Sequence, residues 1–314
     1  MKAELDPALA AVIAAIPSWA GLETEVAPIT IGMTNSNYKV RIGDERFVVR
    51  LGGKNTDLLG IDRTSECAAA RAAAAEGVGP EVFAYLPDRN ALITRFVQGV
   101  QISEEHLQGG VVMAAVVRSI KAIHACREIS ATFPVFRIIK AYRNTAALRG
   151  IEVPATFAEL WVKADEIEGA FSSRPSVPCL CHIDLLSANL LQEGHHIWIV
   201  DYEYSGMGDC FFDLGNLSAN NGFGPEADEL LLRLYLGRVT DSQRARLQLM
   251  RIVSDLREGI WGVVQQAVST LDFDYVGYAE RHLARCLACA SDERFGDWLH
   301  ATASGAMDCP ERMG

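Results

Sequence analysis

Residues 22–97 alternate short apolar runs with turn residues, which is the pattern of a small β-sheet. Gly43-Asp44, between two of the runs, is typical of a tight hairpin. The Ala-rich segment 62–76 follows a helical pattern instead and ends at Gly77. We therefore predict a small mixed sheet crossed by one helix and preceded by an amphipathic helix that begins after Asp6. The predicted strands include residues 38–42, 46–51, 81–86 and 91–97.

From Ser103 onward the pattern becomes mainly helical. Gly99 interrupts the pattern where the two parts join. The sequence thus predicts an α+β fold with two lobes, a small sheet lobe at residues 1–98 and a larger, mainly helical lobe at residues 99–314. The predicted helices cover residues 103–124, 136–149, 154–171, 212–220, 225–236, 241–268 and 273–290.

The stretch 179–215 differs from the helices around it and reads CLCHIDLLSANLLQEGHHIWIVDYEYSGMGDCFFDLG. A short apolar run leads into a loop that carries His182, Asp184 and Asn189. After a hairpin, a second apolar strand ends on Asp201. We therefore expect two carboxylates and an amide to converge at strand ends.

These residue types are the ones that phosphoryl transfer requires. A carboxylate must orient and deprotonate the attacking hydroxyl, and oxygen ligands must hold magnesium against the phosphates. Asp184 fits the base, whereas Asn189 and Asp201 fit the metal. A neutral imidazole can donate and accept hydrogen bonds at once, so His182 is expected to brace the loop.

The predicted sheet lobe offers candidate phosphate ligands. The segment 31–38 (IGMTNSNY), which contains Asn35, lies between two predicted strands, and its backbone amides would cover the phosphates as a flap. Arg50 ends the next strand, and Glu66 on the following helix is its candidate ion-pair partner. The alternatives are an ordinary turn and a surface ion pair.

Composition limits the possible partners and location. The 314 residues are 49% hydrophobic and 22% charged, and no apolar run approaches the length of a membrane helix. Acidic residues and Pro7 stand where a signal peptide would be basic, so a cytoplasmic protein is expected. The formal charge of −11 argues against nucleic acid and suits a cationic substrate. We interpret the eight cysteines mainly as buried small hydrophobes.

Three segments of the sequence are HIDLLSANLL, IVDYEYSGMGDCFFDLGN and SDLREGIWGVVQQAVSTLDFDYVGYAERH. Together they resemble the choline/ethanolamine kinase family, which is related to aminoglycoside phosphotransferases and to the protein-kinase fold, and the resemblance spans most of the chain. Many small-molecule kinases share the first motif. D-Y-E-Y followed by D-L-G-N is more specific, and W-G-x-x-Q with F-x-Y-x-x-Y in the third segment strengthens the match.

The resemblance implies a bilobal protein-kinase-like fold that uses ATP and Mg²⁺. It implies Asp184 as the catalytic base and Asn189 and Asp201 as magnesium ligands. It also implies Arg50 on the ATP phosphates with Glu66 bracing it. The hinge strand at Arg95 to Val97 would meet adenine through its backbone.

For the acceptor, the resemblance implies an amino-alcohol pocket formed by Tyr204, Trp261 and Tyr278, with Phe273 as a supporting ring. A quaternary ammonium cannot donate a conventional hydrogen bond, so aromatic faces with a nearby carboxylate hold it best. Without the resemblance, the same rings at helical spacing would be read as core. The role of Tyr275 stays open.

Two departures from the family pattern bear on the substrate. Glu258 stands where eukaryotic members have a second tryptophan, and Asn220 stands where they have an acidic residue. Glu258 would then supply the negative charge that Asn220 does not. More oxygen acceptors would suit a primary ammonium at least as well as a quaternary one. The choice between choline and ethanolamine therefore stays open.

Three hypotheses remain in competition. The first is an ATP- and magnesium-dependent kinase that phosphorylates the hydroxyl of choline or a related amino alcohol. The second keeps the reaction and changes the acceptor to an aminoglycoside, thiamine or homoserine. The third is a catalytically silent module that retains only the fold, against which the intact Asp184, Asn189 and Asp201 argue.

Overall fold

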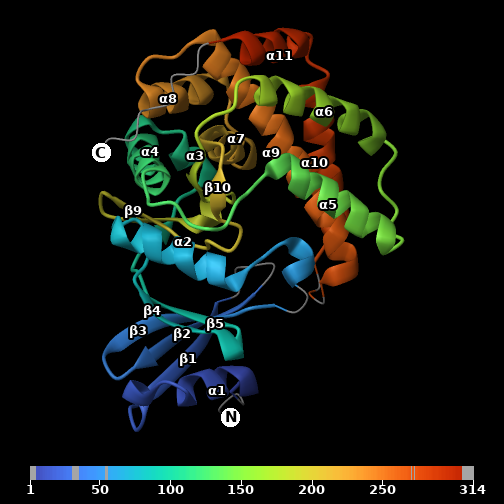
Figure 1. Ribbon diagram of the computed structural model, residues 1–314. Coiled ribbons are helices and arrows are strands. Elements are labelled where there is room, and N and C mark those ends of the chain that lie inside the picture. The colour runs from blue at the N-terminus through green and yellow to red at the C-terminus, as the bar shows by residue number, and fades with distance from the viewer. Residues whose placement is uncertain (1–4, 30–34, 54–55, 270, 272, 306–314) are drawn as a thin grey trace.

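A sheet lies at one end of the molecule and most of the helices lie at the other (Figure 1). The computed structural model describes residues 5–29, 35–53, 56–269, 271 and 273–305. The predicted α+β arrangement, with a small sheet part followed by a larger helical part, is therefore confirmed. The part of the chain that the model describes contains no helix both long and apolar enough to cross a bilayer.

The main sheet has five strands in the order β1-β2-β3-β5-β4. Every neighbouring pair is antiparallel, so the prediction of a mixed sheet was wrong in this respect. For two of the four pairs the reason is local, because tight turns join β2 to β3 and β4 to β5, and a short turn can connect only antiparallel neighbours. Gly43 and Asn90 occupy these turns with positive φ angles of 57° and 49°. The strands are β1 (Thr24–Ile29), β2 (Ser36–Ile42), β3 (Glu45–Leu51), β4 (Val82–Leu86) and β5 (Ala91–Arg95).

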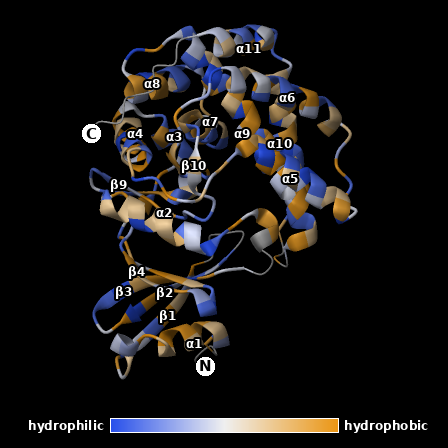
Figure 2. Ribbon diagram, in the orientation of Figure 1, coloured by the Kyte–Doolittle hydropathy of each residue, from blue (hydrophilic) through white to orange (hydrophobic). Residues whose placement is uncertain are grey.

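Helices cover both faces of this sheet. Helix α1 (Pro7–Ala14), capped by Asp6 as predicted, buries Leu9 against the strands in a separate small core. Helix α2 (Arg63–Ala75) is the predicted crossing helix and is capped by Asp62. Its alanines join the larger core on the other side, so α2 links the sheet to the helical part (Figure 1). Helix α4 mixes hydrophobic and hydrophilic residues, as an amphipathic helix does, whereas α1 (PALAAVIA) is apolar throughout, so the prediction that the first helix is amphipathic was wrong (Figure 2).

The helical part is built around α9 (Asp241–Val268), whose side chains are buried along most of its length. The predicted single helix at 103–124 is instead two helices, because Gly109 and Gly110 interrupt it and Gly109 caps the second. Helix α11 was not predicted. The other helices are α3 (Glu104–Leu107), α4 (Gly110–His124), α5 (Val135–Leu148), α6 (Phe157–Ser173), α7 (Cys210–Asn220), α8 (Pro225–Leu236), α10 (Tyr275–Ala290) and α11 (Phe295–Ser304).

Five short strands support the stretch singled out by the sequence. They are β6 (Val100–Gln101), β7 (Cys179–Cys181), β8 (Leu190–Glu193), β9 (His196–Ile199) and β10 (Gly206–Gly208). Strand β7 pairs with β10, and β8 pairs with both β6 and β9. Because the chain leaves β7 into one loop and leaves β9 directly before Asp201, the two predicted carboxylates are brought to the same region. Single 3₁₀ turns lie at Pro17–Trp19, Thr56–Leu59, Pro87–Arg89 and Ser187–Asn189.

Candidate active site

Side chains of α7 hold the loop after β7 through hydrogen bonds to its main chain. The carboxylate of Asp213 accepts hydrogen bonds from the main-chain N–H groups of His182 and Ile183, each at 2.7 Å. The side chain of Asn216 accepts from Leu185 N at 2.6 Å. Ile183 has a φ of 76°, a conformation that costs energy for a β-branched residue and that these bonds stabilise. The D-L-G-N motif, used in the sequence only as a family marker, thus anchors the loop.

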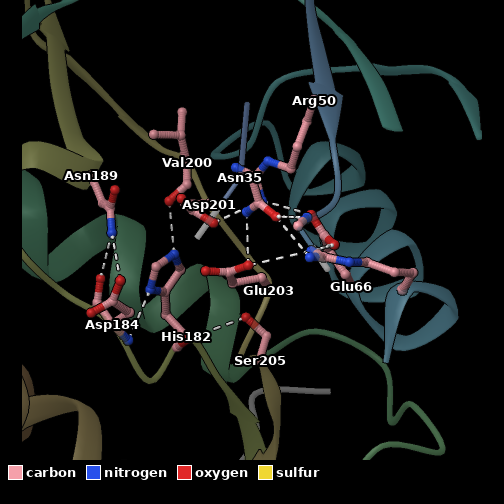
Figure 3. A network of polar contacts seen from close by, with 12 residues as sticks. Asn35, Arg50, Glu66, His182, Asp184, Asn189, Val200, Asp201, Glu203 and Ser205 are labelled. Carbon is pink, nitrogen blue, oxygen red and sulfur yellow. Dashed lines mark hydrogen bonds and ion pairs between the residues drawn. The ribbon is translucent and has the colours of Figure 1, made fainter. Parts of the chain in front are cut away.

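His182 connects this loop to the strand that precedes Asp201. Its Nε2 lies 2.9 Å from the carbonyl oxygen of Val200, which can only accept, so Nε2 carries the proton. Its Nδ1 accepts from the main-chain N–H of Asp184 at 3.3 Å. Burial lowers the pKa of His182, which favours the neutral ring that these two bonds require. The predicted bracing contact is present (Figure 3).

Asp184 and Asn189 are in contact, and Asp201 lines one cavity together with Asn189. Asn189 Nδ2 donates to Asp184 Oδ2 at 3.1 Å and to the Asp184 carbonyl at 2.9 Å (Figure 3). With its nitrogen engaged, the side-chain oxygen of Asn189 is the atom left for a cation. Asp201 has a φ of 72°, a strained conformation of the kind that occurs at functional sites.

Arg50 links the sheet to the helical part through Asp201. Its Nη1 lies 2.7 Å from Asp201 Oδ1 and 2.6 Å from Glu66 Oε1. The side chain of Glu66 is almost completely buried. The predicted pair of Arg50 and Glu66 is therefore present inside the molecule, and it is not an ordinary surface ion pair.

Arg63 and Glu203 extend this network. Neither of them was identified as a site residue from the sequence. Arg63 donates to Glu66 at 2.7 Å, to Asn35 Oδ1 at 2.7 Å and to Glu203 at 3.3 Å. Asn35 Nδ2 in turn donates to Glu203 at 2.8 Å (Figure 3). Residues 31–34 of the predicted flap lie outside the described residues. The available signals were the i,i+3 spacing of Arg63 and Glu66 and the position of Glu203 in D-Y-E-Y.

Glu203 is a buried carboxylate with a strongly shifted pKa. Burial, followed by the nearby charge of Asp201, raises its pKa to about 7. Arg50, Arg63 and Asn35 act in the opposite direction. Burial and the charge of Asp201 thus favour the protonated form of Glu203, whereas the hydrogen bonds from Arg63 and Asn35 favour the anion.

A cavity of about 390 Å³ lies between the sheet and the helical part. Arg50, Glu66, Asn189 and Asp201 line its polar side, and Val97 also lines it. Apolar residues of both parts line the rest, a composition that suits a flat ring system beside a phosphate chain. They include Val48, Ala70, Leu92, Ala188, Leu191 and Val200.

Arg95 lines the same cavity, but its guanidinium packs elsewhere. The guanidinium carbon lies 4.8 Å from the Phe47 ring centroid and 5.4 Å from that of Phe83, in the small core under α1. It also forms ion pairs with Glu45 and Glu81. The guanidinium of Arg95 is therefore directed to the small core, and the hinge role of Arg95 to Val97 stays a prediction.

The predicted acceptor residues come together in the structure. The indole N–H of Trp261 donates to the Tyr204 hydroxyl at 2.8 Å, and the Tyr278 hydroxyl donates to Glu258 Oε2 at 2.8 Å. The rings of Trp261 and Tyr278 meet edge to face at 5.5 Å. Four residues predicted from α9, α10 and the D-Y-E-Y motif thus form one cluster.

Other residues expected near this cluster behave differently. Phe273 touches the Tyr278 ring at 6.0 Å but is 40% exposed. Tyr275 is buried and its hydroxyl lies 2.9 Å from Ser269 Oγ, which is a core position. The side-chain nitrogen and oxygen of Asn220 are buried, and the described residues offer them no hydrogen-bond partner.

Asp184 is partly buried and lies near other negative charges. Burial first, and then the charge of Glu258, raise its pKa to about 8, while Arg257 acts in the opposite direction. A carboxylate with this pKa can hold or release a proton near neutral pH, as a general base requires. The effect of Glu258 also indicates that the acceptor cluster lies close to Asp184.

Comparisons with known proteins agree with one another. The family model for choline/ethanolamine kinase matches residues 26–223. Ethanolamine kinase 1 of Mus musculus is 27% identical over an alignment of 309 residues, with coverage of 84% of this chain and 83% of that protein. A choline/ethanolamine kinase family protein from Mesorhizobium loti has a similar structure, with a TM-score of 0.82, 32% identity, and coverage of 94% and 98% of the two chains. Choline kinase LicA from Streptococcus pneumoniae shares the fold, with a TM-score of 0.74, 19% identity, and coverage of 90% and 98%.

Proposed function

The chain belongs to the choline/ethanolamine kinase family, and we propose that, as a kinase of this family, it transfers the γ-phosphoryl group of ATP to the hydroxyl of choline or ethanolamine. One observation carries the proposal. Asp184 is hydrogen-bonded to Asn189, which lines the cavity, and it lies near enough to Glu258 of the acceptor cluster for that charge to raise its pKa. A hydroxyl held by that cluster would meet Asp184 at the end of a phosphate chain.

Asp184 is the proposed base, and three groups assist it. It orients the acceptor hydroxyl and takes its proton as the phosphoryl group is transferred. Arg50, fixed by Glu66, offsets negative charge on the phosphates. His182 and the Asp213 carboxylate hold the loop so that Asp184 faces the hydroxyl. In this arrangement residues 1–98 form the ATP-binding lobe and residues 99–314 the catalytic and acceptor-binding lobe.

Asn189 and Asp201 would hold Mg²⁺. Their oxygens are hard donors of the type that Mg²⁺ prefers, and both residues line the cavity beside Arg50. When bound, the ion neutralises charge on the phosphates of the nucleotide. The acceptor cation fits a chain whose formal charge is −11.

The test is a phosphorylation assay with the purified chain, ATP and Mg²⁺. We expect phosphorylated product from choline, ethanolamine or the methylated ethanolamines, and loss of product when EDTA removes the metal. The same assay includes thiamine, homoserine and an aminoglycoside. Product from one of these compounds with none from the amino alcohols would contradict the proposed acceptor, and no product from any compound would contradict the proposed reaction.

The pH dependence of catalysis is expected to depend on Glu258. Its charge is one of the causes that raise the pKa of Asp184, so Glu258→Gln should lower that pKa. The acidic limb of kcat/KM for ethanolamine, where Asp184 takes up a proton, should then lie at lower pH than in the wild type. A pH profile of both proteins measures this. A limb that stays in place or moves to higher pH would show that Asp184 does not feel Glu258.

A further inference from the structure

Arg257 is a buried charged residue of the acceptor cluster that no sequence motif singled out. Its side chain is 1% exposed, and its guanidinium carbon lies 4.4 Å from the ring centroid of Tyr204. Its Nη1 lies 2.5 Å from Glu258 Oε1. Burying an arginine is costly unless the charge is compensated, so the residue needs an explanation beyond packing.

The guanidinium lies over the Tyr204 ring, one of the aromatic faces that a quaternary ammonium would use. Aromatic faces hold such a cation because it offers no N–H donor. The Arg257 guanidinium already forms a cation–π contact with the Tyr204 ring. Its positive charge would repel a second cation at the same ring. A trimethylammonium would also have to open a tightly packed place, since Glu258 and Trp261 are each only 3% exposed.

The remaining groups of the cluster suit an ammonium that carries hydrogens. The two oxygens of Glu258 accept from Arg257 and Tyr278, and a carboxylate oxygen has lone pairs for a further donor. The hydroxyls of Tyr204 and Tyr278 are additional acceptors. A primary ammonium offers three N–H donors to these oxygens, and each methyl group removes one.

We propose that Arg257 and Glu258 set the acceptor class of this enzyme to alcohols with an N–H-bearing ammonium, ethanolamine before its methylated forms, and disfavour choline. The proposal rests on the proposed function and names the substrate within it. Arg257 acts by occupying the Tyr204 ring and compensating Glu258, so it is a specificity-determining residue.

The first test compares kcat/KM for ethanolamine, N-methylethanolamine, N,N-dimethylethanolamine and choline at saturating ATP and Mg²⁺. We expect a stepwise decrease, with ethanolamine at least tenfold above choline. Equal or higher values for choline would overturn the proposal while leaving the kinase function intact. A wild type that phosphorylates none of the four would instead contradict the proposed function.

The second test replaces Arg257 with Met, which keeps a long apolar side chain and removes the charge from Tyr204. The ratio of kcat/KM for ethanolamine to that for choline should fall at least threefold. Arg246→Met is the matched control, because Arg246 is equally buried, pairs with Asp209 and stacks on Phe171 at 4.2 Å away from the acceptor cluster. It should leave the ratio unchanged.

Further variants keep this test decisive. Arg257→Lys keeps a charge but loses the flat group over the ring, so it should move the ratio in the same direction if Arg257→Met does not fold. An unchanged ratio in a folded Arg257 variant would overturn the proposal.

L-serine adds a carboxylate to ethanolamine and tests the Nε and Nη2 groups of Arg257, which are buried without a partner among the described residues. Preference for L-serine would make Arg257 an anion ligand and overturn its proposed role.

Discussion

Replacing Asp184 with Asn is expected to lower kcat by about 10²- to 10⁴-fold, the usual contribution of a general base. The amide keeps the size of the side chain and an oxygen for the Asn189 bond, but it cannot take a proton. Binding of ATP should change little, because Arg50 and Asp201 are untouched. Steady-state kinetics and calorimetric titration with ATP measure the two effects. Near-normal turnover in this variant would remove Asp184 from the mechanism.

The Asp184→Asn variant should be more stable than the wild type at alkaline pH. The pKa of Asp184 is raised to about 8 in the folded protein, whereas an unfolded chain has its ordinary value near 3.8. Between these values the folded state binds a proton that the unfolded state does not, so the wild type loses stability as the pH rises toward 8. Asn has no such dependence. The Tm advantage of Asp184→Asn should therefore be larger at pH 8.5 than at pH 5.

Thermal unfolding at the two pH values tests this second effect. A Tm difference that shrinks as the pH rises would show that Asp184 is stabilised as an anion in the folded protein. Loss of turnover together with a gain in stability separates a catalytic residue from a structural one, because a structural carboxylate would lose both. The two measurements together thus test the role of Asp184 more strictly than activity alone.

The reaction centre was predictable because its residues lie close together in the sequence. Asp184 and Asn189 share one loop, and Asp201 follows the next hairpin, so local structure alone brings them near one another. The pairing of Arg50 with Glu66 could be predicted only from the order of the two lobes, and the structure contains this ion pair. Local turn chemistry likewise predicted the hairpin, the Asp6 cap of α1 and the end of α2 before Gly77.

The contacts that could not be predicted join distant parts of the chain. Arg63 bonds to Glu203, 140 positions later, and no short motif carries that information. Arg257 lies beside a predicted residue, yet only the packing of α9 against Tyr204 places its guanidinium on the ring. The break between α3 and α4 was signalled by Gly109-Gly110, and the helical pattern around it concealed that signal.

Asp213 gives the second large expected effect, although it is not proposed to touch either substrate. Its carboxylate accepts the main-chain N–H groups of His182 and Ile183 at 2.7 Å and also contacts His124 Nε2 at 3.0 Å. Asp213→Ala leaves these buried donors without an acceptor. We expect a loss of about 2 to 5 kcal/mol in the free energy of unfolding, because each unsatisfied buried donor costs about 1 to 3 kcal/mol.

Turnover should fall as well, by about 10²-fold, because Ile183 would no longer be held at a positive φ and Asp184 would lose its position. Asp228→Ala is the control, since Asp228 is similarly buried and accepts from Ser218 and Arg251, each at 2.5 Å, outside the active site. It should lose comparable stability and keep kcat in the folded fraction. Urea unfolding and kcat at low temperature measure both variants. Equal kcat in the two variants would mean that Asp213 supports the fold alone and does not position the catalytic loop.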